Sequence, residues 1–206
     1  MPDTNNTINI FNTHASYYAE KYMDVSSYHP ALDIFCGNIK MQNASVLEQA
    51  CGPGNVTRYL LDKRPDLQIL ATDLAPNMLA LAKEHNPSIE TELLNCHEIK
   101  SLNKKFDAIV CAFATPYLSK EETIQMIQDA SSALNAGGVF YISTMEDDYS
   151  KSGWQISSKG DKVYMYYHES GYLIKAMEDS GMSLLYQTTL PAPMNGDTDL
   201  ILIAAK

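Results

Sequence analysis

The chain has 206 residues, a length that suits one domain with a sizeable core. Its apolar content of 45% and charged content of 19% are typical of a globular protein. It contains no apolar run long enough to cross a membrane, and the polar start MPDTNNTINIFN differs from a signal peptide. The formal charge of −10, with no basic cluster longer than the pair Lys104 and Lys105, disfavours a nucleic-acid partner.

The cysteines and histidines are scattered along the chain. None of the cysteines lies in a CxxC pair, so the spacing of a zinc ribbon is absent. We expect no metal site, and the alternative is a site that the fold assembles from these scattered residues. We interpret the thiols as the reduced cysteines of a cytoplasmic protein. The residues concerned are Cys36, Cys51, Cys96, Cys111, His14, His29, His85, His97 and His168.

Patterns typical of strands and helices alternate from residue 44 onward. Strands are predicted at residues 44–49, 68–72, 89–94, 106–111 and 139–144. Helices are predicted over residues 56–63, from Pro76 onward, and over 121–134, where Gly137 and Gly138 would stop the last one. This alternation indicates a parallel sheet covered by helices on both faces, with right-handed crossovers.

Two further apolar runs end the chain, at residues 182–189 and 199–205. The link between them is only a turn, whereas a parallel crossover needs a dozen residues or more. The two runs should therefore pair as an antiparallel hairpin.

Two segments are not needed to build this sheet. Residues 1–43 predict one or two helices, at 15–23 and 30–40, and residues 146–168 separate the fifth strand from a helix at 169–179. Additional segments on a core of this kind often determine substrate specificity. Both segments are rich in aromatic residues, which could form a lid over a small acceptor or simply cover the sheet. These residues are Tyr17, Tyr18, Tyr22, Tyr28, Trp154, Tyr164, Tyr166 and Tyr167.

The strongest motif is VLEQACGPGNVT, in which a strand runs into Gly52 and Gly54 and a helix follows. Glycines permit a tight turn and let a ligand approach the backbone. A GxG pair alone is a weak signal, because turns and helix ends give the same letters. Asp73 strengthens it, because a carboxylate about twenty residues beyond such a loop binds ribose hydroxyls. The alternative is that Asp73 caps the helix that begins near Pro76.

Two residues of the motif favour one class of nucleoside over another. A dinucleotide loop needs a small residue at its third glycine position, where this chain has Thr57. Glu48 stands just before the loop, and an acid there would oppose a pyrophosphate. A carboxylate suits a ligand that carries an ammonium and a sulfonium, so NAD is disfavoured.

From residue 44 to about residue 205, the chain resembles the class I S-adenosylmethionine-dependent methyltransferases of small-molecule type. Glu48 matches the acid of their first motif, Gly52 and Gly54 match two of its glycines, and Ala50 replaces the first glycine. Asp73, in ILATDLAPNML, resembles the acid that binds both ribose hydroxyls. The resemblance also implies that Leu74 and Met78 flank the adenine.

Two further stretches and the N-terminal segment extend this resemblance. In LLNCHEI, Asn95 replaces the usual Asp at the adenine edge, and Cys96 would offer its backbone N–H. The stretch FDAIVCAFATPYL implies that Ala112, Phe113 and Thr115 lie near the transferred methyl group, although Phe113 could equally be a core residue. Phe11, Ala15, Tyr18 and Tyr22 form one helical stripe. It resembles the helical cap of these enzymes, in which Tyr18 would close over the donor, and the alternative is that it only packs on the sheet edge.

The resemblance implies a Rossmann-like three-layer α/β sandwich with a mostly parallel seven-stranded sheet, a C-terminal antiparallel hairpin and a helical N-terminal cap. We expect a single methyltransferase domain over residues 1–206. Its parts would be a cap at 1–43, a cofactor-binding core at 44–145, a substrate-side insertion at 146–168, and a C-terminal helix and hairpin at 169–206.

The implied function is methyl transfer from S-adenosyl-L-methionine to a small-molecule acceptor by in-line displacement. A module that senses S-adenosylmethionine without transferring methyl, and a nucleotide-dependent oxidoreductase, are the alternatives. No motif identifies a catalytic residue. Tyr117, His168 and Tyr18 are candidate bases, and we interpret His168 as a surface histidine with satisfied hydrogen bonds. The sequence indicates neither the acceptor nor the oligomeric state.

Overall fold

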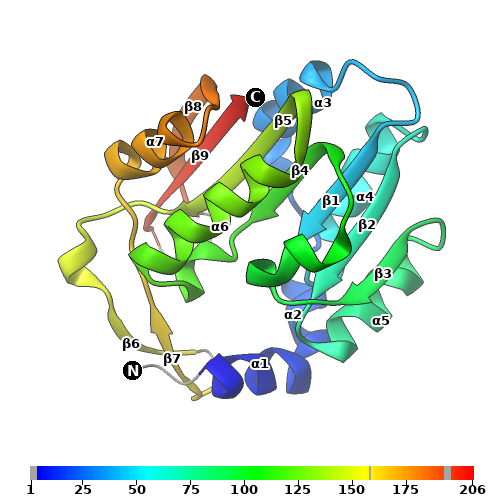
Figure 1. Ribbon diagram of the computed structural model, residues 1–206. Coiled ribbons are helices and arrows are strands. Elements are labelled where there is room, and N and C mark those ends of the chain that lie inside the picture. Colours follow the sequence, from blue (N-terminus) through cyan, green and yellow to red (C-terminus); the bar gives the residue numbers. More distant parts are fainter. Residues whose placement is uncertain (1–3, 158, 193–195) are drawn as a thin grey trace.

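A computed structural model describes residues 4–157, 159–192 and 196–206. At its centre is a seven-stranded sheet in the order β3-β2-β1-β4-β5-β9-β8 (Figure 1). Strands β1 to β5 are parallel, whereas β9 runs antiparallel between β5 and β8. The strands span Ser45–Gln49 (β1), Gln68–Asp73 (β2), Glu90–Leu93 (β3), Phe106–Ala112 (β4), Leu134–Met145 (β5), Ser183–Pro191 (β8) and Thr198–Ala205 (β9). The predicted mostly parallel sheet with a C-terminal hairpin is confirmed.

Helices cover both faces of the sheet, which confirms the three-layer sandwich (Figure 1). One core cluster joins Leu32, Phe35 and Leu60 to one face, and a second joins Met126 and Met177 to the other. The helices of the first face are α3 (His29–Asn38), α4 (Asn55–Lys63) and α5 (Pro76–His85), and those of the second are α6 (Lys120–Ala133) and α7 (Ser170–Asp179). Because both faces are covered, β1 and β4 are buried along nearly their whole length, whereas the edge strand β8 alternates between exposed and half-buried residues.

The N-terminal segment forms α1 (Thr4–Thr13), α2 (Ala15–Tyr22) and a short 3-10 turn, η1 (Ser26–Tyr28). The helices predicted at 15–23 and 30–40 are confirmed with slightly earlier ends, but α1 was not predicted. The chain leaves helical geometry at His14, so the aromatic stripe is divided between α1 and α2. Both helices lie beyond the carboxyl ends of the parallel strands, at the bottom of Figure 1.

Two other segments differ from the prediction. Helix α6 ends at Ala133 and β5 begins at once, so Gly137 and Gly138 do not stop the helix. They lie instead where the pairing of β5 with β4 shifts register, and a Cβ on Gly138 would meet the Asn135 carbonyl oxygen at 2.9 Å. Residues 146–168, for which no strand was predicted, contain η4 (Tyr149–Lys151) and an antiparallel hairpin of β6 (Gly153–Ile156) and β7 (Lys162–Met165).

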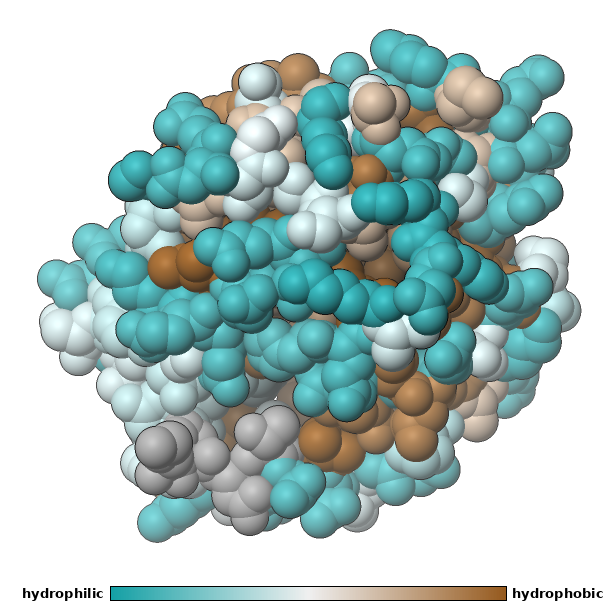
Figure 2. Space-filling view, in the orientation of Figure 1, coloured by the Kyte–Doolittle hydropathy of each residue, from teal (hydrophilic) through white to brown (hydrophobic). Residues whose placement is uncertain are grey.

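Two further features of the structure are the polarity of its surface and the state of its cysteines. The face in Figure 2 is largely hydrophilic, and hydrophobic atoms reach its surface in the lower part, where Figure 1 places α1. Within the residues that the structure describes, no helix combines the length and the apolar character needed to cross a bilayer. All four cysteines are free thiols, as predicted.

Candidate functional site

The loop between β1 and α4 has a left-handed backbone at three positions. Ala50, Gly52 and Gly54 have φ values of 50°, 54° and 80°. A Cβ at Gly54 would lie 2.5 Å from the Asn86 amide nitrogen and 3.0 Å from the Ala82 Cα, so this glycine allows α4 to pack against α5. A Cβ at Gly52 would instead point toward the Tyr18 ring, 3.9 Å away. Gly52 therefore leaves open the space between the loop and the N-terminal helices.

Asp73 is the last residue of β2, and its carboxylate lies beside this loop. One carboxylate oxygen accepts a hydrogen bond from the Gly52 N–H at 2.9 Å, and the other accepts one from the Ala75 N–H at 2.8 Å. The bond to Ala75 forms an Asx turn just before α5. Asp73 is not the N-cap considered from the sequence, because the N-cap of α5 is Ala75, which has no side-chain cap hydrogen bond. Each oxygen retains further acceptor capacity, because a carboxylate has about four lone-pair positions. Burial raises the pKa of Asp73 above its ordinary value.

Glu48 is buried beneath the glycine loop and does not line the cavity described below. Its carboxylate accepts a hydrogen bond from the Thr57 hydroxyl, so the two residues singled out in the motif contact one another. Burial raises the pKa of Glu48 to about 7, despite the opposing effect of the Thr57 hydrogen bond. Near neutral pH the carboxyl is thus poised between its neutral and charged forms.

After β3, the chain turns into the 3-10 helix η2 (Cys96–Leu102) at the edge of the same space. The Asn95 side chain accepts a hydrogen bond from the His97 N–H at 3.0 Å and so caps η2. The Cys96 carbonyl accepts a hydrogen bond from the buried Gln49 side-chain amide at 3.1 Å. This bond fixes the turn against β1. Burial raises the pKa of the Cys96 thiol to about 12.

The end of β4 and the turn η3 (Thr115–Tyr117) form the opposite wall. Phe113 has a φ of 57°, which is strained for a bulky residue, and its N–H donates to the Ser143 carbonyl at 3.1 Å. Strain of this kind often accompanies a functional site. Thr115, which the resemblance placed near the methyl group, is fully buried with its hydroxyl donating to the Ser143 carbonyl at 3.3 Å, so it does not face the cavity.

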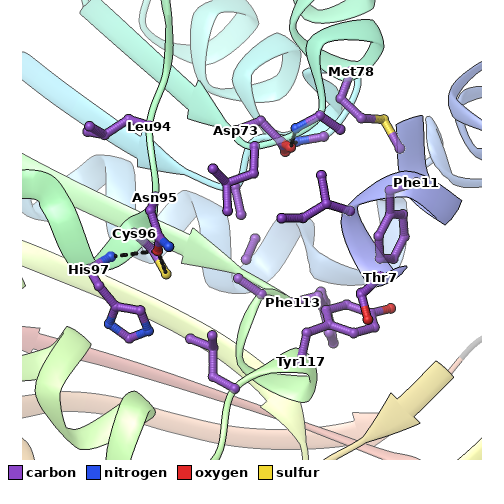
Figure 3. Close-up of a pocket in the computed structure, with 18 of the residues that line it drawn as sticks. Thr7, Phe11, Asp73, Met78, Leu94, Asn95, Cys96, His97, Phe113 and Tyr117 are labelled. Atoms are coloured by element: carbon purple, nitrogen blue, oxygen red, sulfur yellow. Dashed lines mark hydrogen bonds between the residues drawn. The ribbon is translucent and has the colours of Figure 1, made fainter. Parts of the chain in front are cut away.

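These elements surround one cavity, which Figure 3 shows between Asp73, Asn95, Phe113 and the N-terminal helix α1. It holds about 1010 Å³ of empty space, counting the part that opens to solvent. That space is sufficient for a small-molecule ligand. Of the residues predicted to bind the cofactor, all line this cavity except Glu48 and Gly54: they are Tyr18, Ala50, Gly52, Asp73, Leu74, Met78, Asn95, Cys96 and Ala112.

Other lining residues were not assigned to the cofactor site from the sequence. Phe11 was predicted only as part of the N-terminal helical stripe, Phe113 and Tyr117 were considered for other roles, and the others gave no signal because they are ordinary residues of helices and turns. They are Thr7, Ile8, Phe11, Ala75, Leu94, His97, Phe113, Ala114, Tyr117, Leu118 and Glu122. Besides Tyr117, the sequence offered Tyr18 and His168 as candidate bases, and these two lie in different places. Tyr18 lines the cavity, whereas His168 is buried away from it and is not a surface residue.

His168 connects the insertion to η3. One ring nitrogen bonds the Thr115 carbonyl oxygen at 2.8 Å, and the other bonds the Tyr172 hydroxyl. Burial lowers the pKa of this imidazole. The prediction that its hydrogen bonds are satisfied is right, but its predicted surface position is wrong.

The sheet order, the glycine loop after β1 and the acid after β2 together define a class I methyltransferase fold. Sequence comparison agrees, because residues 46–138 match the family model described as a methyltransferase domain. The resemblance to the class I S-adenosylmethionine-dependent methyltransferases is therefore confirmed for the fold and for this region of the sequence.

Two curated relatives with similar sequences are also methyltransferases. The chain is 34% identical over 104 residues to a malonyl-[acyl-carrier protein] O-methyltransferase of Priestia megaterium, an alignment that covers 48% of this chain and 37% of the relative. It is 30% identical over 113 residues to a trans-aconitate 2-methyltransferase of Variovorax paradoxus, covering 55% of this chain and 43% of the relative. These matches thus span less than half the length of the curated relatives.

A solved structure extends the likeness of fold to nearly the whole chain. The 1,6-didemethyltoxoflavin-N1-methyltransferase of Burkholderia thailandensis, determined with 1,6-didemethyltoxoflavin and S-adenosylhomocysteine bound, superposes with a TM-score of 0.75 at 18% identity. The superposition covers 98% of this chain and 88% of that structure.

Proposed function

We propose that the chain is an S-adenosyl-L-methionine-dependent methyltransferase that acts on a small molecule. The observation that carries the proposal is the Asp73 carboxylate, which lines the cavity next to Gly52 and keeps acceptor capacity. A ribose with two neighbouring hydroxyls suits such a carboxylate. The relatives and the solved structure named above are methyltransferases, which supports the same reaction class.

The lining residues fit the chemical groups of this cofactor. Asp73 would accept from the ribose hydroxyls, and Leu74 and Met78 would flank the adenine. Asn95 and the Cys96 backbone would meet the adenine edge, where the His97 side chain also brings a buried ring nitrogen without a partner in the described structure. The loop of Ala50, Gly52 and Gly54 would hold the amino-acid portion, with Glu48 beneath it, and Ala112 would face the methyl group.

The N-terminal helices would close this site. The Tyr18 ring lies over Gly52, so it would cover the donor and exclude water from the reacting carbon. An aromatic ring close to a sulfonium also adds a cation–π attraction of about 0.5–2 kcal/mol.

When bound, S-adenosylmethionine supplies a methyl carbon activated by its sulfonium: the acceptor's lone pair forms the new bond, the C–S bonding pair stays on sulfur, and any proton leaves from the acceptor. The chain itself aligns the methyl donor with the acceptor and keeps water out of the cavity. We assign no general base. Burial raises the pKa of both Tyr18 and Tyr117 above the usual range, so these hydroxyls are suited to donate hydrogen bonds rather than to remove protons.

The domain organisation proposed with this function is a single methyltransferase domain over residues 1–206. Residues 1–43 are its cap, 44–145 its cofactor-binding core, 146–168 its substrate-side insertion, and 169–206 its C-terminal helix and hairpin. We further propose a cytoplasmic location, which suits the four free thiols, and no nucleic-acid partner, which suits the net charge of −10.

Calorimetric titration with S-adenosylmethionine, S-adenosylhomocysteine and NAD tests the proposal. We expect saturable binding of the first two, and saturable NAD binding without them would refute it. Asp73→Ala should weaken donor binding about a hundredfold or more, because hydrogen bonds to a charged group are worth roughly 1.5–3 kcal/mol each and 1.4 kcal/mol is tenfold. Asp62→Ala, which removes an exposed acid on α4, is the matched control.

The same variants address the alternatives. Unchanged affinity in a folded Asp73→Ala protein would mean that Asp73 only forms the turn before α5. A module that binds the donor without transferring methyl would show binding but no turnover with any acceptor. We favour transfer, because the cavity continues past Asp73 toward Thr7, Phe11 and Tyr117 and leaves room for a second molecule.

A further inference from the structure

The part of the cavity beyond the proposed donor site has an aromatic wall. In Figure 3, Thr7, Phe11, Phe113 and Tyr117 lie together on the side opposite Asn95, Cys96 and His97. The Phe11 ring contacts the Tyr117 ring edge-to-face, with centroids 5.0 Å apart, and the Tyr18 ring in the same manner at 5.6 Å. Phe113 is backed by Tyr28, with centroids 5.2 Å apart. These rings come from α1, α2, η1 and the turn after β4, so the wall exists only when the N-terminal helices are in place.

This wall carries no positive charge. Among the described residues that line the cavity there is no lysine or arginine, and the acids Asp73 and Glu122 are present. Lysines of the surrounding elements are directed at other rings: Lys21 lies over Tyr22 at 5.1 Å from the centroid, and Lys120 lies over Tyr172 at 4.4 Å. An acceptor carboxylate placed against Phe11 and Phe113 would lose water and gain no cation. That exchange is unfavourable in a low-dielectric site.

The wall does offer hydrogen bonds suited to a neutral group. Tyr117 lines the cavity, and none of the hydrogen bonds among the described residues occupies its hydroxyl. Thr7 of α1 contributes a second hydroxyl on the same side. A hydroxyl can both donate and accept, so either residue can meet a carbonyl, phenol or ring nitrogen. Flat aromatic walls favour offset or edge-to-face stacking with a planar ligand.

We infer that the methyl acceptor is an uncharged planar aromatic or heteroaromatic molecule, packed against Phe11 and Phe113 and hydrogen-bonded by Tyr117, and not a carboxylate. This inference rests on the proposed methyltransferase function, and it names the acceptor class for the same cavity. It also distinguishes this chain from the relative named for trans-aconitate, because a carboxylate-bearing acceptor has no cationic partner here.

The test is a binding experiment in two stages. S-adenosylhomocysteine is titrated first, and if it does not bind, the proposed function fails rather than the acceptor class. The saturated complex is then titrated with methyl 4-hydroxybenzoate, 4-hydroxybenzoate and trans-aconitate, and with a panel of neutral phenols and nitrogen heterocycles. We expect neutral members to bind and the acid to bind at least tenfold more weakly than its methyl ester. Equal or tighter binding of the acid, or no binding by any neutral compound, overturns the inference.

Variants of the wall sharpen this test. Tyr117→Phe keeps the ring and removes the hydroxyl, so it should weaken a neutral ligand about three- to tenfold and leave S-adenosylhomocysteine affinity unchanged. Thr7→Lys places a cation in the wall and should reduce the tenfold preference for the ester over the acid. Asn9→Lys adds the same charge at an exposed position of the same helix and should not change that preference. If Thr7→Lys and Asn9→Lys behave alike, the charge-free wall does not select the acceptor.

Discussion

Substituting Glu48 by Gln tests whether burial of this carboxyl lowers the stability of the folded protein at neutral pH. The carboxyl is almost completely inaccessible to solvent, and its hydrogen bond comes from the Thr57 hydroxyl. Its pKa is about 7 in the folded chain, against an ordinary value of 4.5. Between these two pH values the folded state keeps a proton that the unfolded state has lost. Stability therefore falls as pH rises from 4.5 to 7, and the loss is complete above the folded pKa.

The size of the effect follows from that difference in pKa. Each pKa unit of difference between the folded and unfolded states corresponds to about 1.4 kcal/mol. The difference for Glu48 therefore lowers the free energy of unfolding by about 3 kcal/mol at pH 8. Gln keeps an oxygen that can accept from Thr57 but carries no charge at any pH. The Glu48→Gln variant should be more stable than the natural chain by up to this amount at pH 8, and the gain should disappear near pH 4.5. In a domain of this length, the gain corresponds to a rise in Tm of roughly 6–12 °C.

Thermal unfolding of both proteins from pH 5 to pH 8, without donor, measures this difference. Glu84→Gln, which removes an exposed acid on α5, is the control and should show no such trend. A difference in Tm that does not change with pH, or a variant that is less stable at pH 8, would refute the reasoning. The second outcome would mean that Glu48 is ionised and well solvated in the folded state.

Three further substitutions and one deletion test other parts of the structure. Ala50→Gly should raise the free energy of unfolding by about 0.5–1 kcal/mol in urea titration because φ is positive there, whereas Gly54→Ala should lower it by more than about 1 kcal/mol. His168→Gln should destabilise the protein at pH 7, where the bond to the Thr115 carbonyl is disturbed, and the difference from the natural chain should narrow at pH 5. The narrowing is expected because the unfolded state takes up a proton at about pH 6.5, before the buried imidazole does. Deleting residues 1–28 should leave a cooperatively unfolding core with at least tenfold weaker donor affinity, and unchanged affinity would refute closure by the cap.

The sheet and its ligand loop were predictable because their signals are local. A parallel strand covered on both faces is rich in apolar residues, and β1, β2 and β4 each contain a short apolar run in the sequence. Asp73 ends one of these runs, so topology alone brings it to the edge where Gly52 lies. The lining residues near the donor follow from that register.

The formation of α1 and the burial of His168 were not predictable, because both depend on contacts between segments that are distant in the sequence. Helix α1 has the sequence TNNTINIFNT, whose asparagines are poor helix formers, and the Phe11 ring packs on Tyr117, which lies far along the chain. His168 is buried because the Thr115 carbonyl, 53 residues away, accepts its ring N–H. No local pattern contains these contacts, so the surface position of His168 and the missing α1 were errors of the same kind.

The contacts that attach helices α1 and α2 of the cap bear on how ligands enter the cavity, which already opens partly to solvent. The apolar contact between the cap and α5 is small, consisting of Ala15 against Ala75 and Met78, with Phe11 and Tyr18 beside them. Several other attachments are polar: Asn12 accepts two hydrogen bonds from Asn77, and His14 lies 3.1 Å from Asp161 at the turn of the β6–β7 hairpin. Polar contacts near the surface exchange readily with water and contribute little net stability. A ligand that fills the space between Phe11, Tyr18 and the sheet would add apolar contacts to the closed form alone, and so would shift the cap toward closure in proportion to its own binding free energy.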